Sequence, residues 1–152
     1  MRAHRIPVAV HVLACLLAWG AWLCALDPHR LPTQYRIDTW QREAGLPSSS
    51  VEAVLQTKDG YIWLGTHDGL VRFDGVRFTT FARSDTPALG SNFIVALYET
   101  TDGDLWIGTD GGGLTRYRGG RFETYTTKNG LASDYILSLA QDSAGSLWIG
   151  TD

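Results

Sequence analysis

The sequence reads DGYIWLGT at residues 59–66, and two close copies follow, DGDLWIGT at 102–109 and AGSLWIGT at 144–151. Each copy contains one tryptophan, so that a tryptophan recurs about every 43 residues, at Trp63, Trp106 and Trp148. The similarity extends upstream, where Leu-Pro-Ser, Leu-Gly-Ser and Leu-Ala-Ser precede the three copies at matching distances. A period of this length over most of the chain indicates a repeat protein.

Each repeat is predicted to contain four short β-strands. In the first repeat the expected strands are 50–57, 61–66, 70–73 and 77–81, separated by Asp-Gly pairs at 59–60, 68–69 and 74–75. Asp-Gly favours a type I′ hairpin turn, in which both central residues have positive φ. Four antiparallel strands in about 43 residues match a β-propeller blade, whereas helical repeats of similar length would need amphipathic stretches that this sequence lacks. We therefore expect an all-β fold with about two and a half blades of four antiparallel strands.

The repeat boundaries divide the chain into segments. A lead-in at 27–49 contains an expected outer strand at 36–40, which would close the ring by pairing with a strand from much later in the chain. The following segments are blade 1 at 50–81, an inter-blade loop at 82–92, blade 2 at 93–125 and the start of blade 3 at 126–152. Because a propeller ring needs about four to eight blades, we expect this chain to be the N-terminal piece of a larger protein.

Residues 1–26 differ from the rest of the chain. A basic start is followed by an almost wholly apolar stretch from Ile6 to Leu26, which is typical of an export signal. Cleavage after Ala25 is favoured, but an uncleaved signal anchor stays open, since the stretch is just long enough to span a bilayer. Both alternatives place the remainder outside the cytoplasm. The two cysteines, Cys15 and Cys24, lie in this segment, so the exported part is expected to have no disulfide framework.

Composition and motifs argue against several classes of function. The net charge is −3 and there is no basic block, which disfavours nucleic-acid binding. Asp102-Gly103-Asp104 lacks the further ligands of an EF-hand, so no metal site is expected. The glycines at 111–113 are followed by neither a helix nor a Lys-Ser or Lys-Thr pair, so they do not form a phosphate loop. The sequence therefore predicts no catalytic residues and no cofactor.

Two segments resemble a known family. GLPSSSVEAVLQTKDGYIWLGTHDGLVRFDGVRFTTF at 45–81 closely resembles the two-component regulator propeller repeat, and NGLASDYILSLAQDSAGSLWIGTD at 129–152 is a second clear match. The resemblance implies the periplasmic, ligand-sensing propeller of a receptor in the bacterial inner membrane, with a sensor histidine kinase as the output. It also implies that this chain is itself no enzyme, that the N-terminal segment or a later helix attaches the protein to the membrane, and that the full-length receptor is a homodimer.

Three alternatives remain open at this stage. The same input region could serve a diguanylate cyclase receptor. The chain could instead be a truncated fragment without function, or part of a periplasmic propeller protein that acts on glycans. The sequence after residue 152 would distinguish a kinase receptor from a cyclase receptor. A catalytic carboxylate pair that breaks the repeat pattern would be needed for a protein that acts on glycans.

Candidate functional residues fall into two groups. The residues that recur in the repeats are expected to be structural, with the tryptophans in the packing between blades and Asp59-Gly60 in an Asp-box-like turn; this group is Trp63, Trp106, Trp148, Asp59, Gly60, Gly65, Gly108 and Gly150. The loops that lead into the innermost strands vary between repeats and would line the mouth of a central channel. We expect them to bind a small molecule or glycan through Ser49, Asn92, Phe93, Asp134 and Tyr135.

Overall fold

The computed structural model describes residues 38–40, 42 and 45–152. The chain divides into two compact units, 1–38 and 39–152, and the ten described strands all lie in the second unit. The expected export signal at 1–26 lies outside the described residues, so it stays a prediction. In the described ranges no helix is long and apolar enough to cross a membrane.

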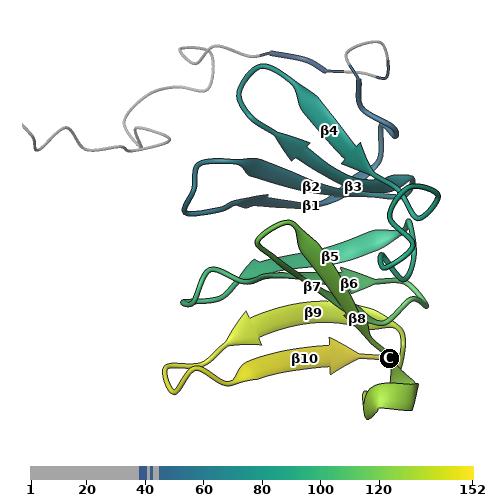
Figure 1. The fold of residues 1–152 in the computed structure, drawn as a ribbon, viewed down its shortest axis with the longest axis vertical. Coiled ribbons are helices and arrows are strands. Elements are labelled where there is room, and N and C mark those ends of the chain that lie inside the picture. Colours follow the sequence, from purple (N-terminus) through teal and green to yellow (C-terminus); the bar gives the residue numbers. More distant parts are fainter. Residues whose placement is uncertain (1–37, 41, 43–44) are drawn as a thin grey trace, which may run out of the picture. The chain divides into compact units, whose positions relative to one another are not determined.

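The second unit is built from three antiparallel sheets that follow one another in chain order (Figure 1). The first sheet contains β1 (Val51–Gln56), β2 (Ile62–Thr66), β3 (Gly69–Phe73) and β4 (Phe78–Phe81). The second contains β5 (Ile94–Glu99), β6 (Leu105–Thr109), β7 (Leu114–Arg118) and β8 (Arg121–Tyr125). The 3-10 helix η3 (Thr127–Asn129) leads to a two-stranded sheet of β9 (Ile136–Gln141) and β10 (Leu147–Thr151). The predicted all-β class with four-stranded antiparallel sheets is confirmed.

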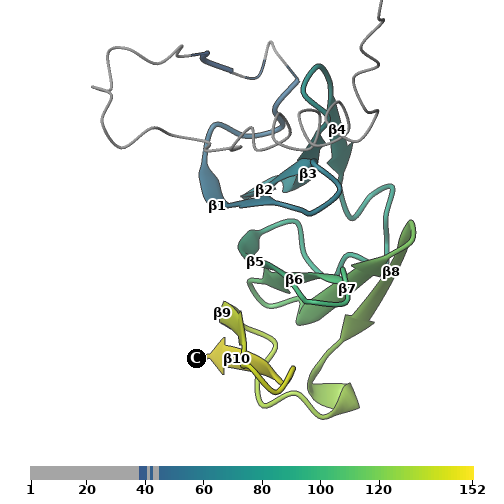
Figure 2. The same ribbon diagram turned by 90° about the vertical axis from the view of Figure 1, so that its left-hand side faces the viewer.

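The sheets stack through their first strands. β1 packs against β5, and β5 packs against β9, so that the sheets form successive layers in both views (Figures 1 and 2). The hydrophobic core joins residues of the first and second sheets, among them Trp63 and Leu70 of the first and Ile94, Leu105 and Ile107 of the second. The first and second sheets therefore bury apolar residues against each other, as expected of consecutive repeats.

A glycine of one sheet meets an isoleucine of the next at both junctions. A Cβ added at Gly65 of β2 would lie 2.9 Å from Cγ2 of Ile94, and one added at Gly108 of β6 would lie 2.7 Å from Cγ2 of Ile136. Both isoleucines are fully buried. Val51 holds their position in the first repeat and is 40% exposed, because no part of the described chain covers it. The glycine of the WLGT and WIGT motifs thus allows close approach of consecutive sheets.

The three repeated tryptophans differ in their surroundings. Trp63 is 2% exposed, and its ring lies 5.2 Å from that of Tyr117 in the second sheet. Trp106 is half-buried against Tyr125, whereas Trp148 is 64% exposed. The difference follows from the order of the sheets, since the second sheet covers Trp63 and no described strand after β10 covers Trp148.

The turns lie where the Asp-Gly pairs predict them, but their type differs from the prediction. In the described part of the chain only glycines have positive φ, so none of the three Asp-Gly pairs forms a type I′ turn. Gly60 N donates to Thr57 O at 2.8 Å, which closes a type I turn that ends in a left-handed glycine. The carboxylate of Asp59 accepts from Oγ1 of Thr57 at 2.5 Å, so the aspartate stabilises the turn without needing positive φ.

The predicted closing strand at 36–40 stays a prediction, because the strand expected to pair with it comes from much later in the chain. Residues 36 and 37 lie outside the described residues, and residues 38–40 form no strand. The ring of Trp40 instead packs on Phe73 and Phe78, with centroids 5.3 and 6.0 Å apart. A strand requires a partner for its backbone hydrogen bonds, and no described strand pairs with these residues.

Candidate functional site

The loops that lead into the first strand of each sheet, which are β1, β5 and β9, lie at one end of the sheets. The turns from β2 to β3 and from β6 to β7 lie at the same end. This follows from the register, because Val51 at the start of β1 pairs with Thr66 at the end of β2, and Ile94 pairs with Thr109 in the same way. We call this end the inner-strand rim and define it as residues 48–52, 66–69, 91–93, 109–113 and 133–135.

Three equivalent serines fix the backbone at the rim. Each hydroxyl oxygen accepts a hydrogen bond from the backbone N two residues later: Ser48 from Ser50 at 3.3 Å, Ser91 from Phe93 at 3.2 Å and Ser133 from Tyr135 at 3.1 Å. Such serine turns hold the chain in one local conformation before the strand begins. The residue that follows each turn therefore occupies the same place in every repeat.

Phe93 lies in a contact that joins the first and second sheets. Its ring centroid is 4.1 Å from that of His67, which belongs to the turn between β2 and β3. His67 Nε2 is in turn 2.7 Å from Oε1 of Glu52 on β1. Glu52 and His67 were not among the predicted site residues. The antiparallel pairing of 50–57 with 61–66 was the available signal, since it places the two near each other.

Tyr135 repeats this arrangement at the next junction. Its ring lies beside Gly111 in the turn between β6 and β7, where an added Cβ would come within 3.4 Å of Cε1 of Tyr135. The side chain is 48% exposed. The backbone N of Gly113 donates to Asp134 O at 2.9 Å, which ties the same turn to the third sheet. Phe93 and Tyr135 are thus aromatic residues at equivalent positions, each against the turn of the preceding sheet.

The other predicted ligand residues differ from these two. The Asn92 side chain accepts from the backbone N of Arg83 at 2.7 Å, and the Asp134 carboxylate accepts from the backbone N of Thr127 at 2.6 Å. Both side chains therefore close the loops between sheets. Ser49 is exposed, and its side chain makes no hydrogen bond to the part of the protein that the structure describes. Ligand contact at all five predicted residues stays a prediction.

Two carboxylates at the far end of the sheets have perturbed acidity. Hydrogen bonds from the backbone N atoms of Arg77 and Val76 lower the pKa of Asp74 below its ordinary value. The Trp148 indole N–H donates to Asp142 at 2.9 Å, and this bond, with the backbone N of Ser146, lowers the pKa of Asp142. Both groups are ionised acceptors that close turns, which is a structural role.

The rim offers aromatic faces beside a carboxylate and an imidazole. Aromatic faces can contact the apolar part of an organic ligand, and a carboxylate and an imidazole can form hydrogen bonds with its polar groups. Among residues 38–40, 42 and 45–152, no group of three or more His, Cys, Asp or Glu side chains is placed to hold a metal ion.

The repeated sheets and their glycine junctions define a repeat protein of the propeller type. Residues 45–68, 88–111 and 130–152 match the family described as two component regulator propeller. Each match includes a loop into an inner strand, that strand and the next one. The chain therefore contains three repeats that match the two-component regulator propeller family.

One solved structure supports the same fold. The crystal structure of the extracellular domain of BT3049 from B. thetaiotaomicron, described as a hybrid two component system, is 25% identical with a TM-score of 0.63. The match covers 77% of this chain and 16% of that one. The extracellular domain of BT4673 from the same organism, described as a one component system, is 22% identical with a TM-score of 0.38 and covers 72% of this chain and 21% of that one. The chain therefore spans a small part of these relatives. A comparison with curated proteins gave no match.

Proposed function

We propose that this chain is part of the periplasmic, ligand-sensing region of a membrane-bound signal-transduction receptor of the sensor histidine kinase type. The observation that carries the proposal is the match to regulator propeller repeats, together with a fold like that of an extracellular domain from a hybrid two component system. The basic and apolar N-terminal segment supports export. In this proposal the chain binds its ligand, and the catalytic reaction belongs to an output domain.

The inner-strand rim is the proposed ligand site, and a small molecule or glycan is the proposed ligand. Phe93 and Tyr135 supply ring faces. The Glu52–His67 pair of the first repeat supplies hydrogen-bonding groups beside Phe93. Because each ring lies against the turn of the preceding sheet, a ligand on the rim contacts two sheets together. Binding there would bias the packing of one sheet against the next, which is the kind of change that a receptor can transmit.

The proposal is tested by titrating the exported protein with a panel of neutral oligosaccharides, uronic acids and amino acids. Tryptophan fluorescence and the thermal unfolding midpoint report binding. For a compound that binds, we expect Phe93→Ala and Tyr135→Ala each to weaken affinity at least tenfold, about 1.4 kcal/mol. Val76→Ala is the control, since Val76 is 83% exposed in the turn between β3 and β4, at the far end of the first sheet. Binding that neither rim variant changes would place the site elsewhere.

A further inference from the structure

Three arginines gather on one face of the second sheet at the end opposite the rim. Arg116 and Arg118 are two residues apart on β7 and so project to the same side. Across the ladder, Arg118 pairs with Arg121 and Arg116 pairs with Glu123 on β8. These four side chains line an open pocket of about 170 Å³.

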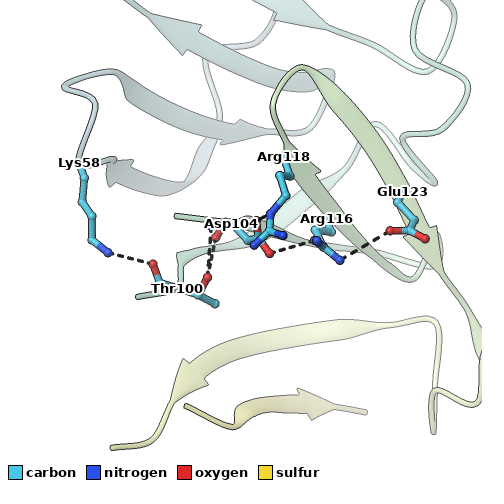
Figure 3. A network of polar contacts seen from close by, with 6 residues as sticks. All are labelled: Lys58, Thr100, Asp104, Arg116, Arg118 and Glu123. Carbon is cyan, nitrogen blue, oxygen red and sulfur yellow. Dashed lines mark hydrogen bonds and ion pairs between the residues drawn. The ribbon is translucent and has the colours of Figure 1, made fainter. Parts of the chain in front are cut away.

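A buried carboxylate aligns two of the guanidinium groups (Figure 3). Asp104 is 7% exposed, and its Oδ2 lies 2.9 Å from Nε of Arg116 while its Oδ1 contacts Nε of Arg118. Asp104 is itself held by Thr100, whose backbone N donates to Asp104 O at 2.9 Å. Because Asp104 engages Arg118 through Nε, the terminal nitrogens of Arg118 stay available to another acceptor.

The charges of this cluster do not balance. Three guanidinium groups face two carboxylates, Asp104 and Glu123, and Arg121 has no ion pair within the described part of the chain. Arg118 and Arg121 are directly opposite each other, an arrangement of like charges that destabilises a sheet. The two-residue turn Gly119-Gly120, with φ of 55° and 85°, holds them in this register. An anion between the two arginines would relieve both the excess charge and the repulsion.

The first sheet shows that the repeat does not require this cluster. Its equivalents of Asp104, Arg116, Arg118 and Arg121 are Tyr61, Arg72, Asp74 and Arg77. Arg72 lies over the Tyr61 ring at 4.5 Å, and Asp74 accepts hydrogen bonds from its own turn. Asp74 and Arg77 remain exposed although the second sheet packs against the first. The equivalent positions in the second sheet, Arg118 and Arg121 beside the turn between β7 and β8, therefore lie where the repeat is exposed to solvent.

We propose that Arg118 and Arg121, with Arg118 aligned by Asp104, form a binding site for an oxyanion group such as sulfate, phosphate or carboxylate. Two guanidinium groups that face each other match the oxygen atoms of such a group, to which arginine donates paired hydrogen bonds. The site is separate from the inner-strand rim, since it lies at the opposite end of the sheets.

Isothermal titration calorimetry with sodium sulfate and sodium phosphate tests the proposal. The ionic strength is held constant with sodium chloride. We expect saturable binding by the wild-type protein and at least tenfold weaker binding by Arg121→Gln. Arg77→Gln is the matched control, because Arg77 has the same place in the first repeat, and it should bind as the wild type does. Arg121 is exposed and has no ion pair with a described residue, so its substitution is expected to leave the fold intact, which circular dichroism checks.

Glucose 6-sulfate, glucuronic acid and glucose distinguish a free anion from an anionic group on a larger ligand. Competition of both anionic sugars with sulfate, and none by glucose, would support recognition of the shared oxyanion group. Absence of saturable binding at matched ionic strength, or equal binding by the Arg121→Gln and Arg77→Gln variants, would overturn the proposal. Anion binding that persists in Phe93→Ala and Tyr135→Ala keeps this result independent of the proposed rim site.

Discussion

The glycine at the junction between the first two sheets gives a prediction whose sign is informative. Gly65 does not have positive φ, so a side chain at this position meets only a problem of space. The Cβ of Gly65→Ala would lie 2.9 Å from Cγ2, 3.1 Å from O and 3.2 Å from Cβ of Ile94. In a strand without this neighbour, alanine would stabilise by roughly 0.5–1 kcal/mol relative to glycine. Overpacking of a filled core instead costs about 1–3 kcal/mol, so we expect a net loss of stability.

The assay is urea unfolding followed by tryptophan fluorescence for wild type, Gly65→Ala, Ile94→Ala and the double variant. Ile94→Ala alone should cost about 2–5 kcal/mol, because it leaves a cavity at a fully buried position. In the double variant the new methyl group occupies part of that cavity. The stability loss of the double variant should therefore be smaller than the sum of the two single-variant losses by at least about 1 kcal/mol. Additive losses, or a Gly65→Ala protein as stable as wild type, would refute the close packing of Gly65 against Ile94.

Two further predictions concern the third repeat. Acrylamide should quench the fluorescence of Trp148 much more than that of Trp63, because their side chains are 64% and 2% exposed. The Trp148→Phe variant should therefore show a lower quenched fraction than wild type, and Trp63→Phe should not. Equal effects of the two substitutions would contradict this packing. The lowered pKa of Asp142 means that the ionised carboxylate adds stability above its ordinary pKa of 3.8, and this stability is lost as the pH falls through the lower folded value. Asp142→Asn should therefore lose less stability than wild type between about pH 6 and about pH 3 in urea unfolding, and parallel pH profiles would show that the hydrogen bond from Trp148 does not stabilise the charge.

Much of the strand arrangement follows from the sequence because the repeat displays the same pattern three times. The alternation of apolar residues and the position of Asp-Gly pairs locate the strands to within one or two residues, as β2 at Ile62–Thr66 shows for the predicted 61–66. The turn type was wrong because Asp-Gly fits two geometries. The aspartate at 59 stabilises a type I turn through its own side chain, which the dipeptide alone does not reveal.

The site was harder to predict because its contacts join different repeats. Variation between loops singled out Phe93 and Tyr135 together with Asn92 and Asp134, yet the latter two close the loops from within. The contact of His67 with Phe93 depends on how one sheet packs on another, which no local pattern encodes. The arginine cluster also escapes prediction, because the motif around Asp104 suggests only a calcium ligand and its arginine partners lie on β7.

Alkaline phosphatase fused after Asp152 tests whether this chain is exported, as the proposed role in a receptor's sensing region requires. A matched fusion to β-galactosidase, which is active only in the cytoplasm, is the control in the same Gram-negative host. We expect high phosphatase activity and low β-galactosidase activity, with both reversed when residues 1–26 are deleted. High β-galactosidase activity from the full chain would contradict export, and with it the proposed role as a periplasmic sensor.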